Sequence, residues 1–175
     1  MQPWGSVAPQ LGLYLIEHGF EVEIVTMHPS LFTIASQFDS ADALLAHLKS
    51  LQPDMKGEFD PFAMRYFIKF VEAGGQITPR IPDMDVIADE IAAGRPLITL
   101  LTHWFLFDSS LKPRFTGHFN VVSDIDQTHV SVNDPDWGEP FGGKHRHTKE
   151  HYRYAIFANA YQSIDGACLI KIHKK

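Results

Sequence analysis

Apolar positions along the chain recur with two periods, which predict helices mainly in the first half and strands mainly in the second. Spacings of three and four residues indicate helices, and alternation indicates strands. The helices expected on this basis cover residues 11–18, 40–51, 60–73, 83–93 and 149–160, and the strands cover residues 20–25, 76–81, 97–102, 118–124, 128–134 and 166–172. This order is typical of an α+β protein whose N-terminal helices pack against a mostly antiparallel sheet.

Polar residues and breakers give the expected boundaries of these elements. Ser6, Ser40 and Asp83 each stand just before an apolar helical run and are predicted N-caps. Residues 103–117 and 136–147 show neither period and are rich in polar residues, glycine and proline. We therefore predict that both stretches are loops.

The strands over residues 118–124 and 128–134 are predicted to form a β-hairpin, because both are rich in valine and a polar break at residues 125–127 separates them. With a three-residue loop, His118 lies directly opposite Asp134 and both side chains point to one face. A carboxylate beside an imidazole fixes its tautomer and stabilises its positive charge. A slip of one residue would place the two side chains on opposite faces. This pair is the main candidate for catalytic residues.

Composition and charge exclude several classes of function. The chain has 175 residues and a mass of 19.8 kDa, which suits one domain with a sizeable core. Hydrophobic residues make up 45% and charged residues 21%, which argues against intrinsic disorder. The formal net charge is −6, and the only basic run is Lys174-Lys175. Nucleic acids and membranes are therefore not expected partners.

The single cysteine, Cys168, excludes a disulfide framework and a cysteine-based metal site. It lies in an alternating apolar run near the C-terminus, which predicts a buried structural thiol rather than a nucleophile. The chain shows no signal peptide and no apolar stretch of membrane-spanning length. We expect a cytoplasmic protein, unless a segment upstream of Met1 carries a signal.

The motif Gly117-His118-Phe119-Asn120-Val121-Val122, followed by Val132-Asn133-Asp134-Pro135, resembles papain-like cysteine peptidases of the bacteriocin-processing type, the peptidase C-thirty-nine-like group. Residues 5–24 are similar to the second helix and following strand of that family. The resemblance implies a papain-like fold in which a cysteine on an N-terminal helix attacks an amide bond. It implies that His118 is the general base and that Asp134 orients it. The implied substrate is a peptide or a small amide, and no cofactor or metal is expected.

The chain departs from this family at the nucleophile. Such enzymes carry a glutamine and then Cys-Gly-Pro at the start of a long helix, and nothing here matches that motif. Ser6 is a candidate for a substituted nucleophile, with Gln2 as a candidate oxyanion donor. The interpretation we prefer is that Gly5-Ser6 opens the second helix and that the cysteine helix lies before Met1 or has been lost. Residues 1–175 then form one peptidase-like domain, either a part of an amide hydrolase or a peptide-binding pseudoenzyme.

Two further groups of residues offer alternatives. The spacing of His145, His147 and His151 suggests a zinc site and a metal-dependent hydrolase, although it matches no helical zinc motif and falls in a predicted loop. Trp104 and Trp137 flank the hairpin. They are candidates for the wall of a substrate-binding cleft, or else belong to the core or to an interface.

Overall fold

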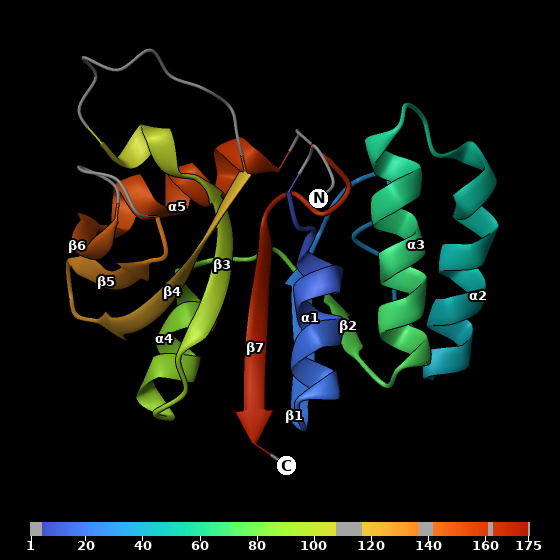
Figure 1. Ribbon diagram of the computed structural model, residues 1–175, viewed down its shortest axis with the longest axis horizontal. Helices are drawn as coiled ribbons and strands as arrows, with labels where there is room; N and C mark the ends of the chain where they lie inside the picture. Colours follow the sequence, from blue (N-terminus) through green and yellow to red (C-terminus); the bar gives the residue numbers. More distant parts are fainter. Residues whose placement is uncertain (1–4, 108–116, 137–141, 161–162, 175) are drawn as a thin grey trace.

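The computed structural model describes residues 5–107, 117–136, 142–160 and 163–174, and a seven-stranded mixed sheet forms its centre (Figure 1). The strand order is β2-β1-β7-β3-β4-β5-β6. The strands are β1 (Phe20–Thr26), β2 (Gln76–Pro79), β3 (Leu97–Thr102), β4 (Gly117–Ile125), β5 (His129–Asp134), β6 (Gly143–Thr148) and β7 (Cys168–Lys174). Among the described strands, only β1 and β2 pair in parallel. The prediction of an α+β protein with a mostly antiparallel sheet is confirmed.

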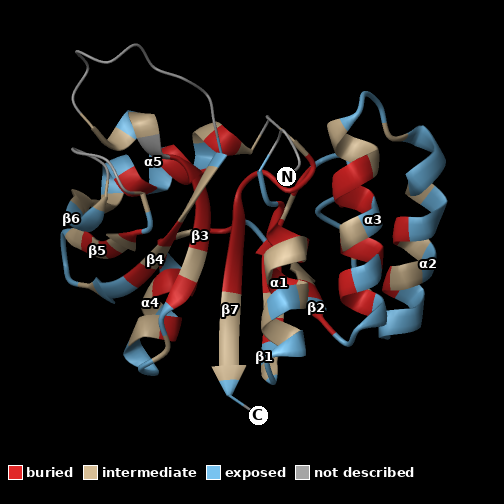
Figure 2. Cartoon of the chain, in the orientation of Figure 1, coloured by how far each residue is buried: buried red, intermediate tan, exposed pale blue. Residues whose placement is uncertain are grey.

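Helices cover both faces of the sheet. The helices are α1 (Ala8–Glu17), α2 (Ala41–Leu51), α3 (Phe59–Glu72), α4 (Met84–Ala92) and α5 (Lys149–Asn159), with short 3-10 helices η1 (Gln52–Asp54) and η2 (His103–Leu106). One hydrophobic core joins α1, α2 and α3 to β1 and β7, and a second joins α4 and α5 to β3, β4 and β5. Figure 2 shows the buried residues concentrated along the central strands and on the helix faces turned toward them. None of the described helices is both long and apolar enough to span a membrane.

Of the three N-caps predicted from the sequence, two are found in the structure and one is not. The hydroxyl of Ser40 accepts a hydrogen bond from the amide of Ala43, and Asp83 likewise caps α4, as predicted. The prediction for Ser6 is wrong, because Val7 is the N-cap of α1 and offers no side-chain bond. The carboxylate of Asp165 instead accepts the Ala8 amide at 3.1 Å, from a distant part of the chain.

Two predicted loops contain regular structure. Part of residues 136–147 forms strand β6, and η2 lies within residues 103–117. The β6 sequence escaped the prediction because its inward positions are His145 and His147, which alternate with exposed Lys144 and Arg146 rather than with aliphatic residues. Histidine rings thus take the place of an apolar face in this strand.

Close contact between α1 and α3 depends on Gly12. A Cβ atom at this position would lie 2.6 Å from Cε2 of Phe70, and both residues are buried. We expect Gly12→Ala to lower the free energy of unfolding by about 1–3 kcal/mol, because overpacking outweighs the better helix propensity of alanine. Urea denaturation measures this loss.

A double-mutant cycle provides the control for Gly12. In a Phe70→Leu background the smaller, more flexible side chain leaves space beside α1, so Gly12→Ala should cost less than in the wild-type protein. A Gly12→Ala protein that is more stable than wild type would contradict this account of the helix contact.

Candidate functional site

His118 and Asp134 lie at the same edge of the sheet. β4 begins with Gly117 and β5 ends with Asp134, and the two strands are antiparallel neighbours. His118 shares a strand face with Val122, which belongs to the core beneath α5. The site therefore lies on the face covered by α4 and α5, at the end of the sheet where β3 also ends.

The imidazole of His118 contacts a buried carboxylate. Its Nε2 lies 2.7 Å from Oδ1 of Asp134, and the two side chains are 19% and 2% exposed. The backbone amide of Asp136 donates to the same oxygen at 2.9 Å. The Asp136 amide therefore holds this carboxylate oxygen in place, and the same oxygen faces Nε2 of the His118 ring. The predicted contact is confirmed, while the catalytic roles of both residues stay predictions.

The register that produces this contact differs from the predicted one. Val122 pairs with Val132 instead of Val130, because Ile125 already pairs with Val130 beside the turn. A bulge between Val122 and Asp124 shifts the register back by only one residue. Asp134 is therefore displaced by two residues from the expected position, and His118 reaches it diagonally rather than directly. The predicted direct pairing is wrong. The contact survives because a shift of two residues keeps both side chains on one face.

A buried polar cluster lies next to the pair and was not found by sequence analysis. The hydroxyls of Thr99 and Tyr152 each donate to Oδ1 of Asn120 at 2.6 Å. All three residues are at most 1% exposed. Thr99 and Asn120 are cross-strand partners in β3 and β4, whereas Tyr152 comes from α5. The polar residue Asn120 at an inward position of a strand was the one signal in the sequence, but its partners Thr99 and Tyr152 are distant along the chain.

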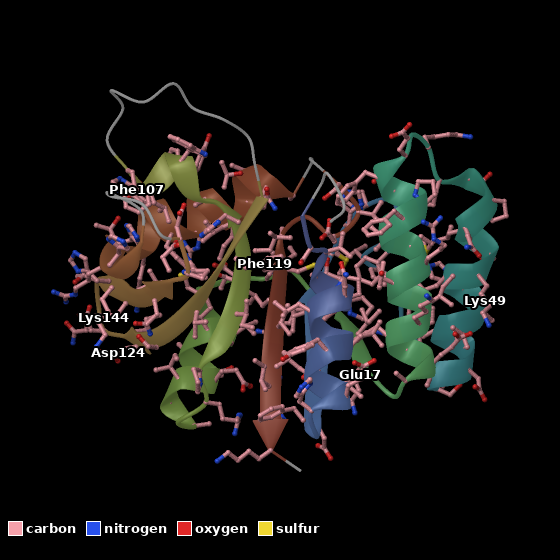
Figure 3. All side chains as sticks on the ribbon, in the orientation of Figure 1. Glu17, Lys49, Phe107, Phe119, Asp124 and Lys144 are labelled. Carbon is pink, nitrogen blue, oxygen red and sulfur yellow. The ribbon has the colours of Figure 1, made fainter. Side chains whose placement is uncertain are left out.

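The late histidines form an aromatic cluster. Phe107 lies edge-on to both His145 and His147, with ring centroids 5.1 and 5.6 Å apart, and His147 stacks against Tyr152. Figure 3 shows Phe107 at the side of the sheet formed by β5 and β6. Within the described residues, no group of three or more histidine, cysteine, aspartate or glutamate side chains is placed to hold a metal ion. The zinc hypothesis thus gains no geometric support there.

His147 gives the protein an expected sensitivity to acid. The pKa of His147 is lowered from 6.5 to about 4, mainly by burial, with nearby His145 and His151 also lowering it and Asp134 opposing them. The unfolded chain takes up a proton near 6.5, but the folded protein does so only near 4. The free energy of unfolding should therefore fall as pH falls through this range, and hold its full value above it.

Denaturation by urea at several pH values checks this expectation. His147→Phe should reduce the pH dependence, because it removes the titrating group and retains an aromatic ring. His18→Phe is the control, since His18 is an exposed histidine at the end of α1. An equal reduction in both variants would contradict the role of burial at His147.

The structure describes two of the other predicted site residues, Ser6 and Trp104. Ser6 is exposed just before α1 and forms no hydrogen bond with His118 in the described structure. Trp104 is half-buried in η2. Gln2 and Trp137 lie outside the described residues.

Cys168 is the buried thiol that the sequence predicts. It belongs to the core beneath α1, on the opposite face from His118, and burial raises the pKa of its thiol. The raised pKa disfavours the thiolate form, and the position on the opposite face separates the sulfur of Cys168 from the imidazole of His118. The geometry thus gives an imidazole and its orienting carboxylate without a thiol beside them in the described residues. No family model, curated protein or solved structure matches the chain.

Proposed function

We propose that this chain is a cysteine peptidase-like domain with a papain-like fold, in which His118 and Asp134 act on peptide or small amide substrates. The observation that carries the proposal is the 2.7 Å contact between Nε2 of His118 and the buried carboxylate of Asp134. A buried acceptor on one ring nitrogen favours the tautomer with the proton on Nε2, which makes Nδ1 the basic atom.

The reaction that suits this pair is nucleophilic acyl transfer. Nδ1 of His118 takes the proton of a thiol, whose sulfur attacks the amide carbon. The carbon–nitrogen bond then breaks, and the imidazolium returns the proton to the leaving amine. Water hydrolyses the resulting thioester, with His118 again as the base. Asp134 holds the ring and stabilises the imidazolium through each step.

In this proposal the thiol comes from a segment outside the described residues. Cys168 lies in the core on the other face of the sheet from His118, and the raised pKa of its thiol disfavours the thiolate. The resemblance to bacteriocin-processing peptidases places such a thiol on a helix that would precede Met1. The reading frame upstream of Met1 is therefore the first test, and a glutamine followed by Cys-Gly is the expected result. A stop codon or an unrelated sequence there would contradict the enzyme proposal.

Hydrolysis of a fluorogenic peptide amide by the protein that includes this segment is the second test. His118→Ala should reduce the rate by about 10²- to 10⁴-fold, the usual contribution of a general base. His129→Ala is the control, because His129 lies on the neighbouring strand β5, at its opposite end. Equal activity of the two variants would refute the role of His118.

A second candidate function is peptide binding without cleavage. It is favoured by one observation, namely that the sole cysteine of the chain is fully buried. The same sheet edge would then bind a peptide without attacking it. Binding of peptides to the 175-residue chain, together with an upstream frame that lacks the cysteine motif, would favour this function over hydrolysis.

A further inference from the structure

The hydrogen-bonded ladder between β4 and β5 stops before it reaches the candidate pair. Its last pair among the described residues is Val121 with Asn133, so His118 and Asp134 both lie beyond it. On its other edge β4 remains paired with β3, and His118 lies opposite Leu101. The contact between the imidazole and the carboxylate therefore bridges two strands whose backbones no longer pair. The ladder with β3 holds this end of β4, but no backbone pair with β5 among the described residues sets the distance between the imidazole and the carboxylate.

The cluster of Thr99, Asn120 and Tyr152 lies at this point. Asn120 is the residue just before the last paired position of β4 and stands two residues after His118 on the same face. Its side-chain oxygen is bound by hydroxyls from β3 and α5. Buried polar groups reduce stability unless they are hydrogen-bonded, so a fully apolar core would have been a simpler solution here.

We propose that Asn120 is a positioning residue for His118. Held by Thr99 and Tyr152, it fixes β4 between β3 and α5 and so keeps the imidazole of His118 against Asp134. The charge of Asp134 also reaches Tyr152: burial raises the pKa of the Tyr152 hydroxyl, and Asp134 adds to the rise. The catalytic importance of this positioning rests on the proposed function, but the geometry can be measured without any activity.

Exchange of the ring proton on Nε2 of His118 provides the test. The 175-residue chain is labelled with ¹⁵N-histidine, and the signal is assigned with a His118→Gln variant. Thr99→Val and Tyr152→Phe each remove one hydroxyl bound to Asn120. Thr26→Val is the matched control, because Thr26 is also fully buried but lies on β1, away from this cluster.

We expect exchange of the His118 ring proton to become about tenfold faster in Thr99→Val and Tyr152→Phe, which corresponds to the loss of one hydrogen bond. Thr26→Val should keep the wild-type rate. Unchanged exchange in Thr99→Val, or equal acceleration in Thr26→Val, would overturn the inference. If Tyr152→Phe fails to fold, Thr99→Val decides the outcome. An unprotected proton in the wild-type protein would instead refute the His118–Asp134 pair itself, and with it the proposed function.

Discussion

Replacing Glu90 with alanine is expected to lower the free energy of unfolding by about 1.5–3 kcal/mol, because it removes a buried carboxylate that accepts hydrogen bonds from charged side chains. Glu90 is 4% exposed on α4. It accepts hydrogen bonds from Arg95 at 2.7 and 3.2 Å, and Lys171 lies 3.2 Å away. In the variant, Lys171, whose side chain is 18% exposed, would retain Glu23 as its one ion-pair partner among the described residues.

The charge of Glu90 also gives this contribution a pH dependence. Burial raises the pKa of Glu90, but hydrogen bonds from Arg95 and Lys171 outweigh it and bring the pKa from 4.5 down to about 2. The stabilisation is therefore fully present above 4.5 and is lost as pH falls toward 2. Urea denaturation near neutral pH measures the full effect of Glu90→Ala.

Glu72→Ala is the matched control for Glu90→Ala. Glu72 forms an ion pair with Lys49 at 2.8 Å, but both side chains are about half exposed, at 45% and 51%. A pair of this kind contributes about 0–1 kcal/mol. If the two substitutions cost the same free energy, the importance of the buried ion-pair network would be contradicted.

The second large effect is expected from Asp134→Asn in the protein that carries its thiol. The value of kcat/KM should fall by about 10²- to 10³-fold, mainly through kcat, the usual cost of removing one electrostatic contact to a developing charge. Asparagine occupies the same space but carries no charge. Its Oδ1 can still accept from the Asp136 amide and from Nε2, so the tautomer is kept while the imidazolium loses its buried counter-charge.

Steady-state hydrolysis of a fluorogenic peptide amide measures this loss. Asp124→Asn is the control, because Asp124 lies on the same hairpin and is exposed. A similar, small loss in both variants would show that the charge of the Asp134 carboxylate does not stabilise a catalytic imidazolium. A large rise in KM with unchanged kcat would indicate a role in substrate binding instead.

The contact between His118 and Asp134 could be predicted because it depends on a local pattern. Alternation fixes the face to which each side chain points, and the two strands are adjacent in sequence. The register was not predictable from that pattern, since alternation does not specify where the turn lies, and the bulge between Val122 and Asp124 leaves the alternation on either side intact. The predicted register was therefore wrong while the predicted contact was correct.

Interactions between distant segments account for the remaining differences. Asp165 caps α1 from across the chain, and Tyr152 meets Asn120 only because α5 packs on β3. Neither contact has a local signature. Strand β6 was missed for a different reason, because His145 and His147 fill inward positions that a hydrophobicity pattern assigns to aliphatic residues.

The tautomer of His118 is the measurement that tests the proposed site most directly. Nitrogen chemical shifts of the ¹⁵N-labelled imidazole, recorded on the 175-residue chain with its ring neutral, distinguish a proton on Nε2 from one on Nδ1. The contact with Asp134 predicts the proton on Nε2 and a basic Nδ1. A proton on Nδ1, or a mixture of the two tautomers, would contradict the assignment of His118 and Asp134 as a catalytic pair.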